Sequence, residues 1–202
     1  ARAPATEPAV VLLDEPFAAL DATLRVSLRE DVASILRDAG ASALLVTHDQ
    51  QEALSLADEV VIMRAGRVEQ AGTPEEIYAR PATSWVAGFL GAADVVPGTA
   101  SDGVVDTELG RLPTAASLRG PVDVLLRPEA CTLEAAGQPG HGIEGRVTQR
   151  AFYGHDQLVT VELASGRQLR SRMPGTTAWR TGDEVVVRIE GPVHALPHAD
   201  AR

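Results

Sequence analysis

The order of apolar and polar residues predicts two different architectures along the chain. Residues 10–13 form a continuous apolar run, which is typical of a strand buried on both faces in a parallel sheet. After Asp21, a possible helix cap, apolar residues recur at spacings of three and four until Gly40, which predicts an amphipathic helix. The residues of this apolar stripe are Leu24, Leu28, Val32, Ile35 and Leu36.

Two more apolar runs follow, over residues 42–49 and 59–63, and they predict strands separated by a helix at "QQEALSLA". Strands that alternate with helices predict a layered α/β domain with a parallel sheet. A glycine turn at Gly66 predicts a hairpin, and the sequence "TPEE" from Thr73 to Glu76 is a capping box that predicts a helix start. A second short helix is expected over residues 81–91, with three large side chains directed toward a core: Trp85, Phe89 and Leu90.

The helical spacing disappears after Gly91. Glycine and proline then separate short, strand-like runs as far as the C-terminus, which predicts a small antiparallel barrel or sandwich. We therefore expect a domain boundary near residues 91–94, with an α/β domain over 1–91 and an all-β, OB-type barrel over 92–202. The sequence shows no internal repeat, although the second region could hide two related half-barrels of low similarity.

Charge excludes several classes of partner. The chain has 18 basic residues, all of them arginine, against 28 acidic ones, and a net charge of −10. Such a balance argues against a nucleic acid or an anionic membrane as a direct partner. No apolar run approaches the roughly 18 residues of a membrane helix, so we expect any membrane association to go through another protein. The single cysteine, Cys131, suits a reducing compartment, and we expect a cytoplasmic protein.

Candidate chemistry lies where the first strand ends. Asp14 and Glu15 follow the apolar run directly, at the carboxyl edge where α/β folds place ligands. Asp14 is placed to hold Mg²⁺, and Glu15 to orient and deprotonate an attacking water. The alternative is that both carboxylates merely cap the next turn. His48, after the second strand, could contact a γ-phosphate or could be an ordinary cap or surface residue.

The motifs "LLDEPFAALD" and "LLVTHDQQEALSLADEVVIMRAGRVEQAGTPEEIYARP" resemble the second half of the nucleotide-binding subunit of an ATP-binding cassette importer. The resemblance implies ATP and Mg²⁺ as cofactors, with Asp14 and Glu15 at the Walker B end, Asp21 in the D-loop and His48 as the switch residue. Residues 92–202 are similar to the transport-associated OB-type extension of such subunits, above all at "LLRPEACTL" and "FYGHDQLVTVEL".

The resemblance also implies partners and a location. It predicts membrane-spanning permease subunits, a homodimer formed through the ATPase and barrel domains, and a peripheral position on the inner face of the cell membrane. It leans toward ferric iron or a polyamine as the solute. The phosphate loop, the Q-loop glutamine and the "LSGGQ" signature are not in the sequence. We therefore expect a fragment that does not hydrolyse ATP alone and that leaves an apolar face of its sheet uncovered.

Two other functions remain open. The chain could be a non-catalytic regulatory or dimerisation module, or an OB-type ligand sensor. Conceivable ligand contacts in the sensor are Arg127, Glu129, Tyr153, His155 and Asp156. The spacings of four histidines match no compact metal motif, and "HALPHAD" near the C-terminus is expected to be a solvated tail. These histidines are His141, His155, His194 and His198.

Overall fold

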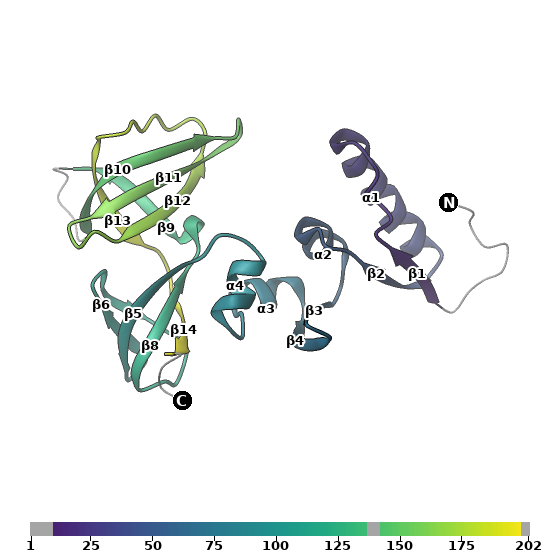
Figure 1. The fold of residues 1–202 in the computed structure, drawn as a ribbon, viewed down its shortest axis with the longest axis horizontal. Helices are drawn as coiled ribbons and strands as arrows, with labels where there is room; N and C mark the ends of the chain where they lie inside the picture. The colour runs from purple at the N-terminus through teal and green to yellow at the C-terminus, as the bar shows by residue number, and fades with distance from the viewer. Residues whose placement is uncertain (1–9, 137–141, 199–202) are drawn as a thin grey trace. The chain divides into compact units, whose positions relative to one another are not determined.

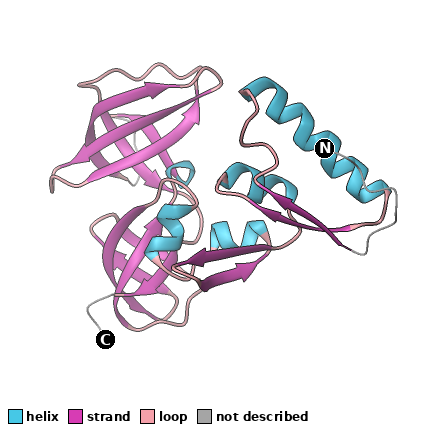
Figure 2. Ribbon diagram, turned by 45° about the vertical axis from the view of Figure 1, so that its right-hand side comes forward, coloured by secondary structure: helices cyan, strands magenta, loops and turns pink. Residues whose placement is uncertain are grey.

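The computed structural model describes residues 10–136 and 142–198, and the chain divides into two compact units between Pro81 and Ala82. Figure 1 traces the elements in chain order, and Figure 2 shows that strands dominate the second unit. His141 and the N-terminal "ARAPATEP" lie outside the described residues. None of the helices in the described ranges is long and apolar enough to cross a membrane.

The first unit begins with a pair of parallel strands. β1 (Val10–Asp14) pairs with β2 (Ser42–Val46) in register, and α1 (Ala22–Asp38) connects them. The helix starts as predicted, because the Asp21 carboxylate accepts a hydrogen bond from the Leu24 backbone N–H at 3.0 Å. It ends before Gly40, whose positive φ of 60° suits a residue without a side chain.

One face of this strand pair is exposed, so the prediction of strands buried on both faces is wrong for the described chain. Val10, Leu12, Leu44 and Val46 are 52%, 74%, 58% and 52% exposed, and the register places all four on the same face. No described element covers that face, in agreement with the expected uncovered apolar surface. In α1 the stripe is also incomplete, because Leu24 and Ile35 are exposed.

The third predicted strand does not join the parallel pair. After α2 (Gln50–Leu56), β3 (Val60–Arg64) pairs antiparallel with β4 (Arg67–Gly72) in a separate two-stranded sheet. The two-residue turn of Ala65 and Gly66 has φ values of 48° and 76°, a combination that matches the twist of a tight hairpin. Pairing through so short a turn costs little loop entropy, which favours the local partner.

Short capped helices follow the hairpin. The predicted capping box is present in full at Thr73, which opens α3 (Pro74–Ala79). α4 (Ser84–Phe89) buries Val86 and Ala87, and its C-cap residue Leu90 is buried as well. The expectation for Phe89 is wrong, since its side chain is 39% exposed and stacks on the half-buried Trp85 with 5.2 Å between ring centroids.

α4 belongs to the second unit, because the division between Pro81 and Ala82 comes before this helix and before the predicted boundary at 91–94. Its end is held there by the Arg127 guanidinium, which donates to the Ala87 carbonyl at 2.9 Å and the Ala92 carbonyl at 3.2 Å. The boundary at 91–94 stays a prediction for the domains, because the observed division separates compact groups of residues.

The described residues of the second unit form two five-stranded antiparallel sheets. The first has the order β14-β8-β5-β6-β7 and the second the order β12-β11-β10-β13-β9, with the short 3-10 helix η1 (Pro128–Ala130) between β8 and β9. The bounds are β5 (Asp94–Ser101), β6 (Val104–Thr107), β7 (Gly110–Pro113), β8 (Gly120–Leu126), β9 (Cys131–Ala135), β10 (Ile143–Phe152), β11 (Asp156–Leu163), β12 (Gln168–Pro174), β13 (Glu184–Ile189) and β14 (His194–Pro197).

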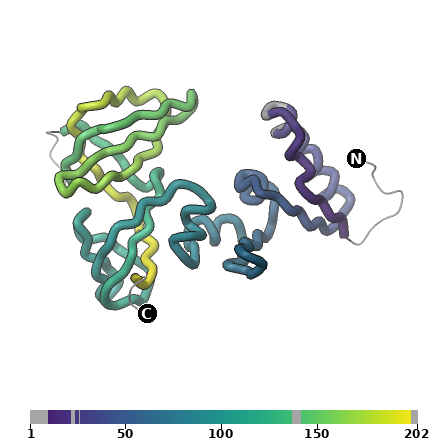
Figure 3. Tube along the Cα trace, in the orientation of Figure 1, coloured from purple at the N-terminus to yellow at the C-terminus, as the bar shows by residue number. Residues whose placement is uncertain are grey.

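The two sheets repeat one plan and exchange a strand. In each, three consecutive strands form a meander and a fourth pairs with the first of them. The fifth strand comes from the other half: β9 follows β8 but pairs with β13, and β14 follows β13 but pairs with β8. Figure 3 shows the result by colour, because the yellow final strand lies beside teal segments. One apolar core joins both sheets.

The C-terminal histidines are part of this structure. His194 lies in β14, and the His198 Nδ1 atom lies 2.7 Å from Asp123 Oδ1. The expectation of a solvated tail is therefore wrong for these residues, since strand exchange gives the segment a partner in β8.

Candidate functional site

The parallel register brings the ends of β1 and β2 together. Asp14 is the register partner of Val46, and the Glu15 backbone N–H donates to the Val46 carbonyl at 2.8 Å. Glu15 has a φ of 42°, a left-handed conformation that costs a residue with a side chain about 1 kcal/mol or more. This sharp turn directs the chain away from the sheet immediately after the two acidic residues.

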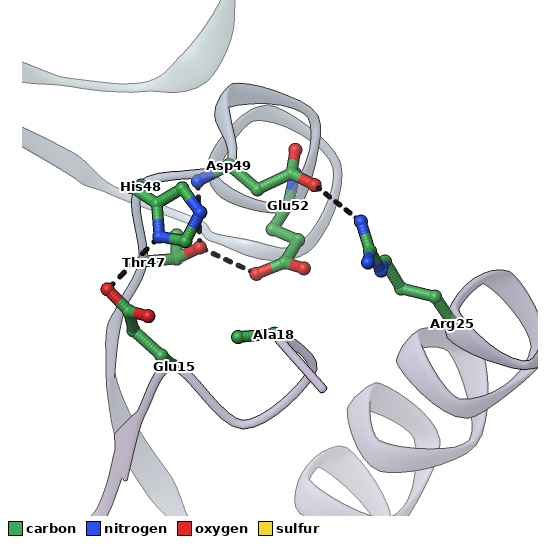
Figure 4. Close-up of a pocket in the computed structure, with 7 residues that line it drawn as sticks. All are labelled: Glu15, Ala18, Arg25, Thr47, His48, Asp49 and Glu52. Atoms are coloured by element: carbon green, nitrogen blue, oxygen red, sulfur yellow. Dashed lines mark hydrogen bonds and ion pairs between the residues drawn. The ribbon is translucent and has the colours of Figure 1, made fainter. Parts of the chain in front are cut away.

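Glu15 and His48 contact each other across these strand ends. The Glu15 Oε1 and His48 Nδ1 atoms are 3.0 Å apart, and Figure 4 shows the two side chains meeting at one side of a small pocket. Both side chains are accessible, at 48% and 75% exposure. The structure thus brings together the two residues expected to do catalysis, while their catalytic roles stay predictions.

The other two candidates lie nearby with different contacts. Asp14 ends β1, and its exposed side chain forms no ion pair with any described residue. A free carboxylate fits one ligand position of Mg²⁺, which usually takes one or two carboxylates and completes its shell with phosphate and water oxygens. Asp21 caps α1 and does not line the pocket. Its expected contact across a subunit interface stays a prediction.

Behind the pocket lies a network of buried charged residues that the sequence did not predict. One nitrogen of Arg29, Nη2, donates to Asp49 Oδ2 at 2.7 Å and to Glu52 Oε1 at 2.8 Å. The second Glu52 oxygen accepts from the Thr47 hydroxyl at 2.6 Å. The Thr47 hydroxyl in turn accepts from the Asp49 backbone N–H at 3.0 Å. The residues on both sides of His48 are therefore tied to the same arginine.

Charge pairing in this network shifts two pKa values. Burial opposes the charged form of Asp49, but hydrogen bonds from the backbone of Glu52 and Gln51 and the charge of Arg29 outweigh it and lower the Asp49 pKa. Burial likewise opposes the Arg29 cation, and the contacts with Glu52 and Asp49 outweigh it and raise the Arg29 pKa. Both groups are charged at neutral pH.

The pocket itself is small, at about 40 Å³. Its lining combines the Glu15–His48 pair with part of the buried network, and Arg25 extends into it from α1 (Figure 4). The lining residues are Glu15, Ala18, Arg25, Thr47, His48, Asp49 and Glu52. This volume accommodates a water molecule and not a nucleotide.

Two sequence signals could have revealed the network. Arg25 and Arg29 lie four residues apart, and so share a face of α1. Asp49 and Glu52 occupy the cap and third positions of α2, where acidic residues favour a helix start. Neither signal says that the two helices meet, which is why periodicity alone missed the contact.

In the second unit, three of the conceivable ligand contacts lie near one another. Tyr153, His155 and Asp156 surround the β10–β11 turn, and Arg172 of β12 pairs with Asp156 and lies 5.9 Å from the Tyr153 ring centre. Glu129 adds its charge to the surroundings of Arg172. Arg127, by contrast, binds backbone carbonyls at the end of α4. The described residues contain no cluster of three or more potential metal ligands.

Comparison with known proteins relates the sequence to importer subunits. Residues 124–195 match the family described as the TOBE domain. Over 97% of its length the chain is 40% identical to the "Fe(3+) ions import ATP-binding protein FbpC" of Pseudomonas fluorescens, and covers 57% of that protein. The chain is similar to the C-terminal part of importer ATP-binding subunits.

Other importer subunits show the same pattern. FbpC 1 of Rhodococcus jostii is 41% identical over 98% of the chain, which covers 58% of that protein. The "Sulfate/thiosulfate import ATP-binding protein CysA" of Bradyrhizobium diazoefficiens is 40% identical over 92% of the chain, which covers 54% of that protein. The chain thus spans a little over half the length of these subunits. Among solved structures, the molybdate-binding protein ModG aligns with 52% of the chain at 13% identity and a TM-score of 0.43.

Proposed function

We propose that this chain forms the Walker B, D-loop and switch-histidine part of the ATP-hydrolysing subunit of an ATP-binding cassette importer. The observation that carries the proposal is the 3.0 Å contact between Glu15 and His48 at the ends of two parallel strands. The importer subunits with about 40% identity support it. Those similarities favour the ATPase over the regulatory module and the ligand sensor considered as alternatives.

Each side chain has a defined task in this proposal. Glu15 orients the attacking water and takes its proton, a contribution of about 10²–10⁴ in rate. His48 contacts the γ-phosphate and, through Glu15, links that contact to the hydrolytic carboxylate. Asp14 would hold Mg²⁺, which neutralises charge on the transferred phosphoryl group when bound. Asp21 would contact the second subunit of the dimer.

The proposal includes partners and a solute. The protein would work as a homodimer with membrane-spanning permease subunits, at the cytoplasmic face of the cell membrane. Several relatives are named as Fe(3+) import proteins, so we propose ferric iron as the solute. The sulfate and thiosulfate importer makes an oxyanion the principal alternative. The relatives described above give no support to a polyamine.

ATP hydrolysis also requires groups that this sequence does not contain. A phosphate loop ends in a lysine that reaches the β- and γ-phosphates, and all 18 basic residues here are arginine. We therefore propose that residues 1–202 alone neither bind MgATP at micromolar concentration nor hydrolyse it. The complete subunit must add the loop opposite Glu15 and His48.

The test uses the complete ATP-binding subunit that carries this segment. Glu15→Gln should keep the MgATP affinity of the parent protein and lower its hydrolysis rate by about 10²–10⁴-fold. The matched control is Glu75→Gln on α3, an exposed carboxylate outside the pocket, which should leave the rate unchanged. Hydrolysis by Glu15→Gln at the parent rate would remove the catalytic role of Glu15 and with it the proposed site.

A further inference from the structure

The turn at residues 47–49 carries His48 and is anchored by the two residues next to it. The His48 ring itself is 75% exposed, and its contact with Glu15 lies at the surface. The residues before and after it are fixed instead: Thr47 through its hydroxyl and Asp49 through both its carboxylate and its backbone N–H. An exposed ring on a fixed backbone takes its direction from the groups that fix the backbone.

These fixing contacts converge on Arg29. Its side chain is 10% exposed and its Nη2 atom binds Asp49 and Glu52, whose own side chains are 25% and 4% exposed. Glu52 passes the constraint to Thr47, and Asp49 caps α2 by accepting from the Gln51 and Glu52 N–H groups. A buried arginine that bridges two carboxylates fixes their separation more strictly than an exposed ion pair would.

We infer that Arg29 is a positioning residue that aims His48 at Glu15. This inference rests on the proposed function, since the aimed imidazole is the one assigned to the γ-phosphate. Arg29 lies 19 residues before His48 in sequence, and its hydrogen bonds go to Asp49 and Glu52 and not to the His48 ring. It therefore acts through Glu52, Thr47 and Asp49. Without Arg29, the turn at residues 47–49 loses its anchor to α1 and the His48 ring samples directions away from Glu15.

The inference is tested on the full 202-residue chain without nucleotide. The His48 Hε1–Cε1 resonance is assigned with His48→Ala, and its displacement on Glu15→Gln measures the contact between the two side chains. In chains with Arg29 the resonance should move clearly. In Arg29→Met chains the displacement should fall to about half or less, because coupling is lost when the two groups no longer meet.

Control variants separate positioning from general destabilisation. Arg37→Met removes an exposed arginine from the last turn of the same helix and should leave the His48 response unchanged. Thr47→Val removes only the hydroxyl that joins Glu52 to the Asp49 backbone, and should reduce the response in the same direction. If circular dichroism shows that Arg29→Met does not fold, the Thr47→Val variant tests the inference in its place.

The inference would be overturned if Glu15→Gln moved the His48 resonance as far in a folded Arg29→Met chain as in the parent. If Arg29→Met does not fold, an undiminished displacement in Thr47→Val would overturn it. The measurement involves no ATP, so it is independent of the test of the proposed function. A complete subunit in which Glu15→Gln hydrolyses ATP normally would refute the proposed site while leaving a measured dependence of the His48–Glu15 contact on Arg29 in place.

Discussion

Among the residues of the first unit whose burial the structure describes, the buried charged side chains are Arg29 and Glu52. Glu52 is 3% exposed and uses both carboxylate oxygens, one for Arg29 and one for Thr47. Glu52→Gln keeps the shape of the side chain but removes the charge that compensates Arg29. We expect a loss of about 2 kcal/mol in the free energy of unfolding, the usual value of a hydrogen bond to a charged partner in a buried setting.

Urea unfolding followed by circular dichroism at 222 nm measures this loss, because α1, α2 and α3 contribute most of the helix in the chain. Glu75→Gln, on the exposed side of α3, is the control and should change the free energy of unfolding by no more than about 0.5 kcal/mol. Equal midpoints for the two variants would show that the buried pair adds no net stability.

Cys131 offers a second prediction for a single residue. Burial in the core of the second unit raises the pKa of its thiol to about 12, with smaller contributions from the charges of Asp94 and Glu129. Between pH 9 and 12 the folded chain therefore keeps the thiol proton, whereas the unfolded chain loses it. The stabilisation by the buried, protonated thiol is complete below pH 9 and is lost as the pH rises toward 12. At pH 9.5 a thiol-labelling reagent should modify the native chain slowly and the urea-unfolded chain rapidly. Equal labelling rates would contradict the burial of Cys131.

At the scale of elements, the two sheets of the second unit repeat a close backbone approach. A Cβ atom on Gly98 of β5 would lie 2.6 Å from the Val105 side chain on β6, and one on Gly145 of β10 would lie 2.5 Å from Val161 on β11. The pairing registers make these positions equivalent, since Val105 faces Ala100 and Val161 faces Val147, each two residues after the glycine. The glycines therefore mark where each meander packs tightly.

Gly98→Ala and Gly145→Ala should each lower the stability of the second unit by about 1–3 kcal/mol, because the valine and the strand backbone must move. Gly88→Ala in α4 is the control, since a Cβ there meets nothing within 4 Å, and alanine in a helix should raise stability by about 0.5–1 kcal/mol. Urea unfolding followed by fluorescence of Trp85 and Trp179, both in the second unit, measures all three variants. Neutral effects at both strand glycines would refute the tight packing.

Elements defined by local chemistry could be predicted from the sequence. The cap of α1 at Asp21, the capping box at Thr73 and the turn at Gly66 depend on residues within four positions of each other. The Glu15–His48 contact was also within reach, because both residues follow strands that were expected to end at one edge of a parallel sheet.

Contacts that depend on the choice of a distant partner could not be predicted. β14 lies in the segment that was expected to be a solvated tail, and nothing in the sequences of β9 and β14 says that each pairs with the other half of the repeat. The same holds for β3, which pairs with β4 and not with β2. Arg29 was missed because a charged residue on a helix normally faces solvent, and only the position of α2 turns it into a buried bridge.

At the scale of the whole molecule, charge decides which partners are accessible. The net charge is −10. Most arginines within the described residues form an ion pair with an acidic side chain, including Arg29, Arg146, Arg170 and Arg188. Such pairing leaves little unpaired positive charge to replace the counterions of a polyanion. The expectation that neither nucleic acid nor an anionic membrane binds directly stays a prediction.

A 20-nucleotide DNA, single- or double-stranded, should not bind the chain with a dissociation constant below about 100 μM at 50 mM salt. Even weak nonspecific DNA-binding proteins have dissociation constants of about 100 μM or lower at physiological salt, where binding is weaker than at 50 mM. Vesicles with 30% anionic lipid, roughly the composition that draws polybasic segments to a surface, should likewise leave the chain in the supernatant on sedimentation. Fluorescence anisotropy provides the first measurement, and uncharged vesicles are the control for the second. Binding that weakens steeply as salt is added would reveal a basic surface that pairing has not neutralised, and would contradict the expectation that any membrane association goes through another protein.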